Sequence, residues 1–194
     1  MPSPDPDRIS RQDLRRALRK HRRDLAAAQP GAGAAAAAHW PPEALAAGWT
    51  FASYRAAGGE IDPGPLAARL MARGARRLLP RILEDGTLQF LDAPEDAPLT
   101  PDAAGMQAPP ADALQIRPDL VIAPLLAFDR FGGRLGQGGG HYDRALADLR
   151  ASGPVLVVGL AFAGQEVDRL DLAPHDQKLD AVLTEAGYRR LPEA

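Results

Sequence analysis

Two apolar segments in the second half of this 194-residue chain place the strongest constraint on its fold. Residues 119–128 are Asp-Leu-Val-Ile-Ala-Pro-Leu-Leu-Ala-Phe, and residues 155–162 are Val-Leu-Val-Val-Gly-Leu-Ala-Phe. Apolar runs of this length are typical of strands buried on both faces of a parallel sheet. A helical pattern from Tyr142 to Ala151 separates them, so strands alternate with helices here. Pro124 must lie at a strand end or a bulge, because it cannot donate a hydrogen bond to a neighbouring strand.

The first half of the chain continues this alternation. Helices are predicted for residues 11–28, with Ser10 as the N-cap, and for residues 63–73. Strands are predicted for residues 49–54 and 76–83, and residues 86–91 would pair with the latter in a hairpin. The remaining predictions are a loop or second helix at 30–40, a short helical stretch at 41–47, a long excursion with little regular structure at 93–118 and a last short strand at 181–184.

This element order predicts an α/β fold in a single domain with three layers. A mostly parallel central sheet would be flanked by helices, and a basic N-terminal helix would be added to it. Residues 1–9 contain three prolines and two aspartates, so we expect them to be disordered. The domain itself is predicted to span residues 10–190.

Composition excludes several classes of protein. The chain has no cysteine, which excludes disulfides, thiolate metal sites and a cysteine nucleophile. Its net charge is −2, so nothing in the overall charge attracts nucleic acid. It has neither an apolar run of transmembrane length nor a signal-peptide pattern. We therefore expect a cytoplasmic protein without a membrane or nucleic-acid partner, and we expect it to be a monomer.

The predicted N-terminal helix has one apolar side and one strongly basic side. Leu14, Ala17, Leu18, His21 and Leu25 recur at helical spacing and would face inward. The basic residues are Arg11, Arg15, Arg16, Arg19, Lys20, Arg22 and Arg23. Such a charged run is usually a solvated helix face. The alternative is that Arg11 and Arg15, which lie one turn apart, reach a polyanionic ligand together.

A glycine-rich segment follows the first apolar strand, and it has the sequence Arg134-Leu-Gly-Gln-Gly-Gly-Gly-His-Tyr-Asp143. Residues 136–140, here called the glycine loop, could bring several backbone N–H groups close to an anion just before a helix N-terminus. The alternative is a flexible surface loop. Arg134 adds a planar fork of donors that suits a phosphate. The pattern is neither a P-loop nor a dinucleotide-binding Gly-x-Gly-x-x-Gly motif.

Several carboxylates could complete a nucleotide site. Asp143, Asp176 and Asp180 could hold Mg²⁺ beside bound phosphates, although Asp serves as often in helix caps and turns. Glu60 lies on a loop after the strand predicted for 49–54, where α/β proteins commonly bind ligands. No nucleophile elbow or metal-type histidine spacing is present. Phosphoryl transfer, which needs mainly positioning and charge neutralisation, suits this set of residues.

In three blocks the chain resembles the 5-formyltetrahydrofolate cyclo-ligase family, whose members are also called 5,10-methenyltetrahydrofolate synthetases. The blocks are Arg11-Gln-Asp-Leu-Arg15; Phe51-Ala-Ser-Tyr54 with Gly59-Glu-Ile-Asp62; and Leu125-Leu-Ala-Phe-Asp129 through Arg134 to Asp143, continued by Gly159-Leu-Ala-Phe162 and Pro174-His-Asp-Gln-Lys-Leu-Asp180. They occur in a consistent order between about residue 10 and residue 186.

The resemblance implies a reaction and a set of site residues. ATP would phosphorylate the formyl oxygen of 5-formyltetrahydrofolate, N10 would attack the activated carbon, and phosphate would leave to give 5,10-methenyltetrahydrofolate and ADP. ATP and Mg²⁺ are the implied cofactors, and the folate would bind with or without a polyglutamate tail. The implied ATP contacts are Arg11, Arg15, Arg134, Leu135, Gly136, Gln137, Gly138, Gly139, Gly140, His141 and Tyr142. Glu60, Phe51 and Tyr54 would bind the folate, Asp143 and Asp176 the metal, and Arg134 and Tyr142 would be catalytic.

The chain departs from the family's usual pattern at two single positions and in one segment. Arg11 stands where a lysine is usual, His141 where an aromatic is usual, and Ala104-Gly-Met-Gln-Ala-Pro109 where Tyr/Phe-Gly-Ile-Pro-Glu-Pro is common. The last change removes an aromatic and a carboxylate, which leaves open a non-catalytic relative that binds a nucleotide or a phosphosugar as a regulator. An RNA-binding role for the basic helix is a weaker alternative, because no aromatic residues are interleaved with its charges.

Overall fold

A computed structural model of the chain describes residues 10–41 and 48–192. The disorder predicted for residues 1–9 and nearly all of the helical stretch predicted for 41–47 lie outside these described residues. The domain limits of 10–190 stay a prediction. Among the helices that the structure describes, none combines the length and the apolarity needed to cross a bilayer.

A seven-stranded sheet organises the molecule, and its strand order is β11-β10-β9-β6-β1-β2-β3. The five inner strands pair in parallel, while β3 and β11 pair antiparallel at the two edges. The bounds are β1 Thr50–Ala52, β2 Arg76–Ile82, β3 Leu88–Asp92, β6 Leu120–Ala123, β9 Leu156–Leu160, β10 Ala181–Thr184 and β11 Gly187–Arg190. The predicted hairpin after β2 is confirmed.

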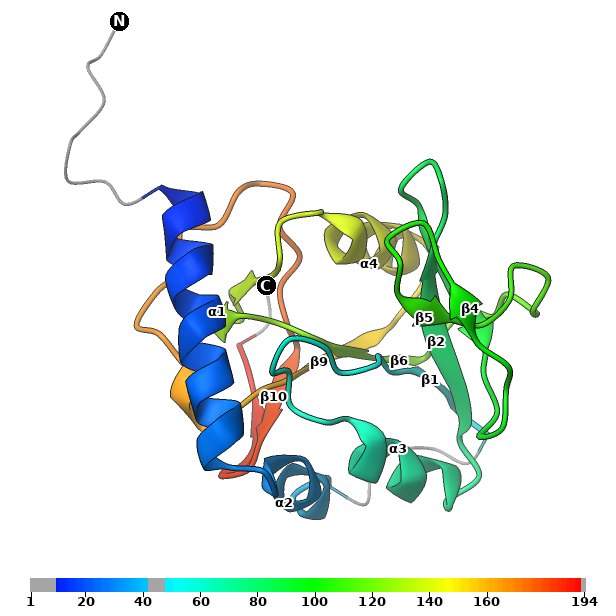
Figure 1. Ribbon diagram of the computed structural model, residues 1–194, viewed down its shortest axis with the longest axis horizontal. Coiled ribbons are helices and arrows are strands. Elements are labelled where there is room, and N and C mark those ends of the chain that lie inside the picture. Colours follow the sequence, from blue (N-terminus) through cyan, green and yellow to red (C-terminus); the bar gives the residue numbers. More distant parts are fainter. Residues whose placement is uncertain (1–9, 42–47, 193–194) are drawn as a thin grey trace, which may run out of the picture.

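Helices cover both faces of this sheet (Figure 1). α2 (Ala32–Ala38) and α3 (Gly64–Met71) lie on one face and α4 (His141–Ser152) on the other. Because side chains alternate along a strand, Leu120 and Ile122 of β6 pack into the core under α2 and α3, while Val121 packs with α4. The predicted three-layer α/β fold with a mostly parallel sheet is confirmed.

The apolar segment predicted as one strand is divided in two. β6 ends at Ala123, and Pro124 lies just beyond it, where its missing N–H costs the sheet nothing. The chain then forms β7 (Ala127–Phe128), which pairs with β8 (Arg134–Leu135) in a separate small sheet. Residues 93–118 contain only β4 (Thr100–Pro101) and β5 (Gln107–Ala108), as expected for an excursion with little regular structure. A 3-10 turn, η2 (Ala163–Gln165), follows β9.

The N-terminal helix, α1 (Arg11–Ala28), forms as predicted, with Ser10 Oγ accepting a hydrogen bond from the Asp13 N–H at 3.1 Å. Its predicted orientation is wrong in part. Leu18 and Leu25 are half-buried as predicted, but Leu14, Ala17 and His21 are exposed, whereas Arg22 is fully buried. The physical reason is visible in Figure 1, where α1 stands beside the three layers instead of covering a face of the sheet. Arg15, Arg19 and Arg22 therefore face the molecule, while Arg16 and Lys20 stay exposed.

Candidate active site

A cavity of about 790 Å³, here called the main cavity, opens beside the carboxyl ends of β1 and β6. The strand order reverses between these two neighbours, because the chain adds β2 on one side of β1 and β6 on the other. Such switch points are where open α/β sheets commonly bind ligands. The glycine loop, the basic side of α1 and the segment after β1 all line this cavity.

The glycine loop forms one wall and is held by its carbonyl oxygens. Arg15 Nε donates to Gly136 O at 3.1 Å, Arg19 Nη2 to Gln137 O at 3.2 Å and Arg144 Nη1 to Gly139 O at 3.3 Å. Within residues 10–41 and 48–192, by contrast, no N–H of residues 136–140 donates a hydrogen bond. The N-terminus of α4 follows directly, and its N-cap, Gly140, has no side chain with which to satisfy the first turn. A row of free backbone donors thus lines the cavity, which is the arrangement that binds phosphates.

Two glycines in this loop cannot be replaced without strain. Gly138 has φ +106° and Gly140 has φ +66°, both in the region that favours glycine. A Cβ at Gly138 would also lie 3.2 Å from the guanidinium carbon of Arg15. The loop therefore follows a path that brings its backbone close to α1.

Arg134, two residues before the glycine loop, is buried, and its guanidinium contacts the first turn of α4. Its Nη2 donates to Asp143 Oδ1, and its guanidinium carbon lies 5.9 Å from the centroid of the Tyr142 ring. Asp143 Oδ1 also accepts a hydrogen bond from the Gln177 N–H at 3.1 Å, which joins α4 to the loop that precedes β10. These contacts fix a guanidinium, a phenol and a carboxylate side by side on the cavity wall.

The predicted metal ligands Asp143 and Asp176 both line the main cavity. Asp176 Oδ2 accepts from the Ala173 N–H at 2.7 Å and lies 3.7 Å from Arg11 Nη2. In the described ranges, no three His, Cys, Asp or Glu side chains gather closely enough to hold a metal on their own. Asp180, the third carboxylate considered, is instead structural, because its Oδ2 accepts from the Val157 N–H at 2.6 Å.

The loop after β1 supplies the other side of the site. Both oxygens of Glu60 are engaged, since Oε1 accepts from Arg22 Nη1 and Oε2 from the Ala57 N–H, each at 3.1 Å. Tyr54 Oη donates to Ile61 O at 2.7 Å, which fixes its ring at the cavity. Glu60 and Tyr54 are therefore held in place before any ligand binds.

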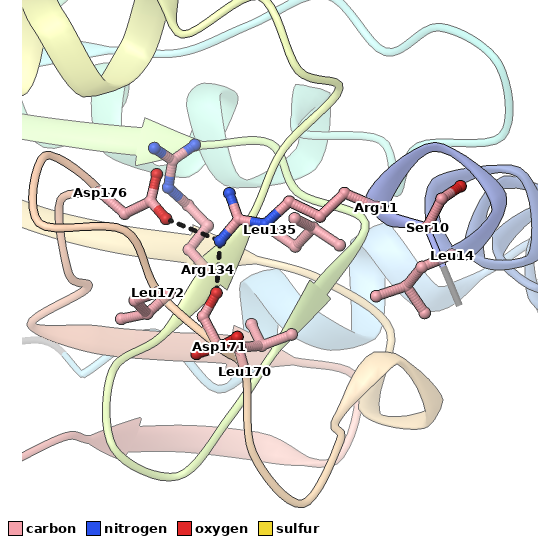
Figure 2. A pocket seen from close by; sticks show the side chains of 9 residues that line it. All are labelled: Ser10, Arg11, Leu14, Arg134, Leu135, Leu170, Asp171, Leu172 and Asp176. Carbon is pink, nitrogen blue, oxygen red and sulfur yellow. Dashed lines mark hydrogen bonds and ion pairs between the residues drawn. The ribbon is translucent and has the colours of Figure 1, made fainter. Parts of the chain in front are cut away.

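A second cavity of about 380 Å³, the side cavity, adjoins the main one (Figure 2). The two share Arg11, Arg134, Leu135 and Asp176 as wall residues. Figure 2 shows Arg11 reaching the Asp171 carbonyl and the Asp176 carboxylate from α1. The remaining wall residues are Leu14, Leu170 and Leu172 together with Ser10 and Asp171.

Comparison with known proteins identifies the family. The family model described as "5-formyltetrahydrofolate cyclo-ligase family" matches residues 7–185. The chain belongs to this family. The cyclo-ligase of Mycolicibacterium smegmatis is 34% identical over 183 residues, which cover 90% of this chain and 93% of that protein. The cyclo-ligase of Escherichia coli K12 is 34% identical over 151 residues, covering 75% and 81%.

A solved structure of the same family supports the fold. The NMR structure of Aquifex aeolicus 5,10-methenyltetrahydrofolate synthetase superposes with a TM-score of 0.76 at 26% identity, and the match covers 94% of this chain and 93% of that one. The corresponding protein of Mycoplasma pneumoniae, at 21% identity and a TM-score of 0.70, shares the fold. The enzyme class follows: the chain is a member of a family of ligases.

One residue that the cyclo-ligase resemblance assigned to the substrate is placed elsewhere by the fold. Phe51 lies in the core with α2 and α3 and has no exposed surface. It is the middle residue of β1, and its side chain packs in the core on one face of the sheet. The cavity lies at the carboxyl end of the strand, and Phe51 is not one of its wall residues. Phe51 is therefore a core residue. The other predicted site residues all line the main cavity.

Several residues that line the main cavity were not predicted. Arg19, Arg22, Arg23 and Arg55 all line the main cavity. A signal for two of them was present, because Arg15, Arg19 and Arg22 are spaced four and three residues apart and so share one helix face. The apolar residues of α1 were instead used to choose the buried face.

The segment that departs from the usual family pattern also reaches the main cavity. Ala104, Met106 and Gln107 are among its wall residues. Asp102 shapes the turn before them, since its carboxylate accepts from the N–H groups of Ile82, Ala104 and Met106 at 2.9 to 3.1 Å. Ala104, at the position of the usual aromatic, therefore lies in the cavity wall, whereas Ala108, at the position of the usual carboxylate, is buried and does not line it.

Burial raises the pKa of all three tyrosine phenols in this chain, and for Tyr54 and Tyr142 the charge of Glu60 adds to the effect. A raised pKa keeps the phenol protonated in the folded state while the unfolded chain ionises. Stability is thus complete below the ordinary tyrosine value of about 10 and falls as the pH rises above it. We expect tyrosinate absorbance of the native protein to lag behind that of the unfolded chain, and the thermal midpoint to fall above about pH 10. Coincident titration of the two states would contradict this.

Proposed function

We propose that this chain catalyses the ATP- and Mg²⁺-dependent closure of 5-formyltetrahydrofolate to 5,10-methenyltetrahydrofolate, with release of ADP and phosphate. ATP-dependent cyclisation to the methenyl product is the general reaction of the family. The observation that carries the proposal is a single cavity lined on one side by the free N–H groups of the glycine loop and on the other by Glu60. Such a cavity can bind a polyphosphate and a second substrate at the same time.

The phosphates of ATP are proposed to bind the glycine loop and the N-terminus of α4. Arg11, Arg15 and Arg134 would add charge-assisted hydrogen bonds from the same cavity. The side cavity supports this, because its leucine-lined space adjoins Arg11 and Arg134 and could receive the nucleoside. His141 and Gln137 complete the wall around the loop.

The chemical step is proposed to begin with attack of the formyl oxygen on the γ-phosphorus, with ADP as the leaving group. An amide-like oxygen is a poor leaving group, and its phosphate ester is a good one. N10 then attacks the formyl carbon, the C–O bond breaks, inorganic phosphate departs and the N10 proton is lost. Arg134 would offset charge on the transferred phosphoryl group. Tyr142 would serve as a hydrogen-bond donor, since its raised pKa keeps its phenol protonated.

The folate is proposed to bind on the side of Glu60 and Tyr54, next to the segment from Ala104 to Gln107. The carboxylate of Glu60 is an acceptor suited to N–H groups of a pterin ring. Its position is supported by its two hydrogen bonds, which leave it with little freedom to reorient.

The carboxylates of Asp143 and Asp176 fit the proposed Mg²⁺, which would supply neutralisation of phosphate charge. Magnesium commonly takes one or two protein carboxylates and completes its shell with waters and substrate phosphates. The absence of a three-carboxylate cluster among the residues that the structure describes is consistent with that mode. Asp143 Oδ2 has no hydrogen-bond partner within the described chain, so it is available as a ligand.

The decisive experiment supplies purified protein with (6S)-5-formyltetrahydrofolate, ATP and Mg²⁺ and follows the near-ultraviolet absorbance of the methenyl product. We expect absorbance to grow only when ATP is present, and to stop when EDTA removes the metal. Folded protein that gives no product at high enzyme concentration would refute the proposal. Tight ATP binding without turnover would favour the regulator alternative, for which the changed Ala104–Pro109 segment is the clue.

A further inference from the structure

Arg22 is the only fully buried side chain of α1, and its guanidinium is surrounded by acceptors. Its side chain is 2% exposed. Nη1 donates to Glu60 Oε1 and to Leu125 O, both at 3.1 Å. Nη2 donates to Gly58 O at 3.1 Å and to Ala57 O at 3.4 Å. One charged group thus joins three segments that are distant in the sequence.

These acceptors lie at the switch point of the sheet. Residues 57–60 belong to the loop after β1, and Leu125 follows β6, the neighbouring strand on the other side of the reversal. Leu125 O also accepts a hydrogen bond from Gln165 Nε2 at 3.0 Å. Arg22 therefore ties the loop that bears Glu60 to a rigid point on the adjacent strand end.

The contact between α1 and this loop is close enough to exclude side chains. Gly59 has φ +81°, and a Cβ there would lie 3.1 Å from the backbone of Arg23. The Glu60 side chain is 12% exposed, so its carboxylate depends on Arg22 and the Ala57 N–H for compensation. A buried carboxylate that loses its cation moves toward water or takes up a proton.

We propose that Arg22 is a positioning residue for the folate, which acts by holding the Glu60 carboxylate and residues 57–60 in the geometry that binds substrate. Its Nη1 and Nη2 groups donate to Glu60 and to three carbonyl oxygens, so these terminal nitrogens are engaged by the protein although Arg22 lies in the wall of the main cavity. Its buried Nε has no hydrogen-bond partner among the described residues. The inference rests on the proposed function, in which Glu60 binds the folate. Under this proposal Arg22 has a different role from Arg15, which lies on the same helix face and holds the glycine loop.

The test compares Arg22→Lys and Arg22→Met with Glu60→Gln and with the double variant Arg22→Lys/Glu60→Gln. Arg16→Ala is the matched control, because Arg16 lies on the same helix, is highly exposed and, among the residues that the structure describes, forms an ion pair only with Asp13. For each protein, KM for both substrates is measured, together with dissociation constants by calorimetry and the thermal midpoint. Lysine keeps the charge but cannot reach four acceptors, so Arg22→Lys should raise the folate KM about tenfold and leave the ATP KM within about twofold.

Non-additivity distinguishes positioning from a purely structural role. If Arg22 acts through Glu60, the double variant should bind folate no more weakly than Glu60→Gln alone. Multiplicative effects, equal losses for ATP and folate, or a lowered thermal midpoint with unchanged folate binding would each overturn the inference. Failure of both Arg22 variants to fold would assign the residue to stability and overturn it too. Absence of turnover in the wild type and in Arg16→Ala would refute the proposed function instead, and the folate dissociation constants would still decide the role of Arg22.

Discussion

Replacing Arg134 with alanine is expected to raise the KM for ATP by about ten- to a hundredfold. Charge-assisted hydrogen bonds contribute about 1.5–3 kcal/mol, and about 1.4 kcal/mol corresponds to a factor of ten. The same change leaves Asp143, whose side chain is 21% exposed, without its guanidinium partner. An unpaired carboxylate beside the phosphate site would repel ATP further. Initial-rate kinetics with ATP varied at saturating folate measure the effect.

Arg76→Ala is a suitable control for this prediction. Arg76 also forms an ion pair, with Asp92 at 2.7 Å, but it lies on β2 outside the walls of both cavities. Its removal should leave the KM for ATP unchanged. If Arg134→Ala and Arg76→Ala gave the same KM for ATP as the wild type, Arg134 would have no place in the nucleotide site.

Replacing Gly138 with alanine is expected to lower kcat/KM for ATP by about tenfold or more. A side chain at this positive φ costs about 1–2 kcal/mol in backbone strain. It would also press on the Arg15 guanidinium, which lies 3.2 Å from the expected Cβ and holds the loop through Gly136 O. The loop would relax away from α1, and its N–H groups would no longer converge.

Gly136→Ala provides the comparison within the same loop. Gly136 has no positive φ, and a Cβ there would meet only Arg134 Nη1, at an ordinary contact distance of 3.5 Å. Its effect on ATP kinetics should therefore be clearly smaller. Equal losses at the two positions would show that the strained path of the loop is unimportant for binding.

The layers of the fold were predictable because burial acts directly on composition. A strand covered on both faces, such as β6 or β9, needs apolar residues at every position, and this leaves a clear pattern in the sequence. A special backbone path at the glycine loop was predictable for a related reason, since the positive φ of Gly138 and Gly140 favours glycine. Pro124 was expected at a strand end or a bulge and lies just beyond β6, but the separate strand β7 was not predicted.

The orientation of α1 could not be obtained in this way. Hydrophobic periodicity assumes that the buried face of a helix packs on a core, but α1 lies beside a polar cavity, so Arg22 is buried and Leu14 is exposed. Phe51 shows a second limit. A shared motif identifies a residue but not whether it reaches the cavity. Phe51 and Tyr54 belong to the same core cluster, but of the two only Tyr54, which lies beyond the end of β1, also lines the cavity.

The hydrogen bonds from α1 to the glycine loop join residues that are 118 to 121 positions apart in the chain. Contacts of such high sequence separation form late in folding, because the entropy of closing a long segment must be overcome first. The proposed nucleotide site therefore forms only once α1 and the glycine loop have come together, although its most basic part is made first. ATP would bind only the completed domain, and by mass action it would then favour the assembled state over any in which α1 has detached.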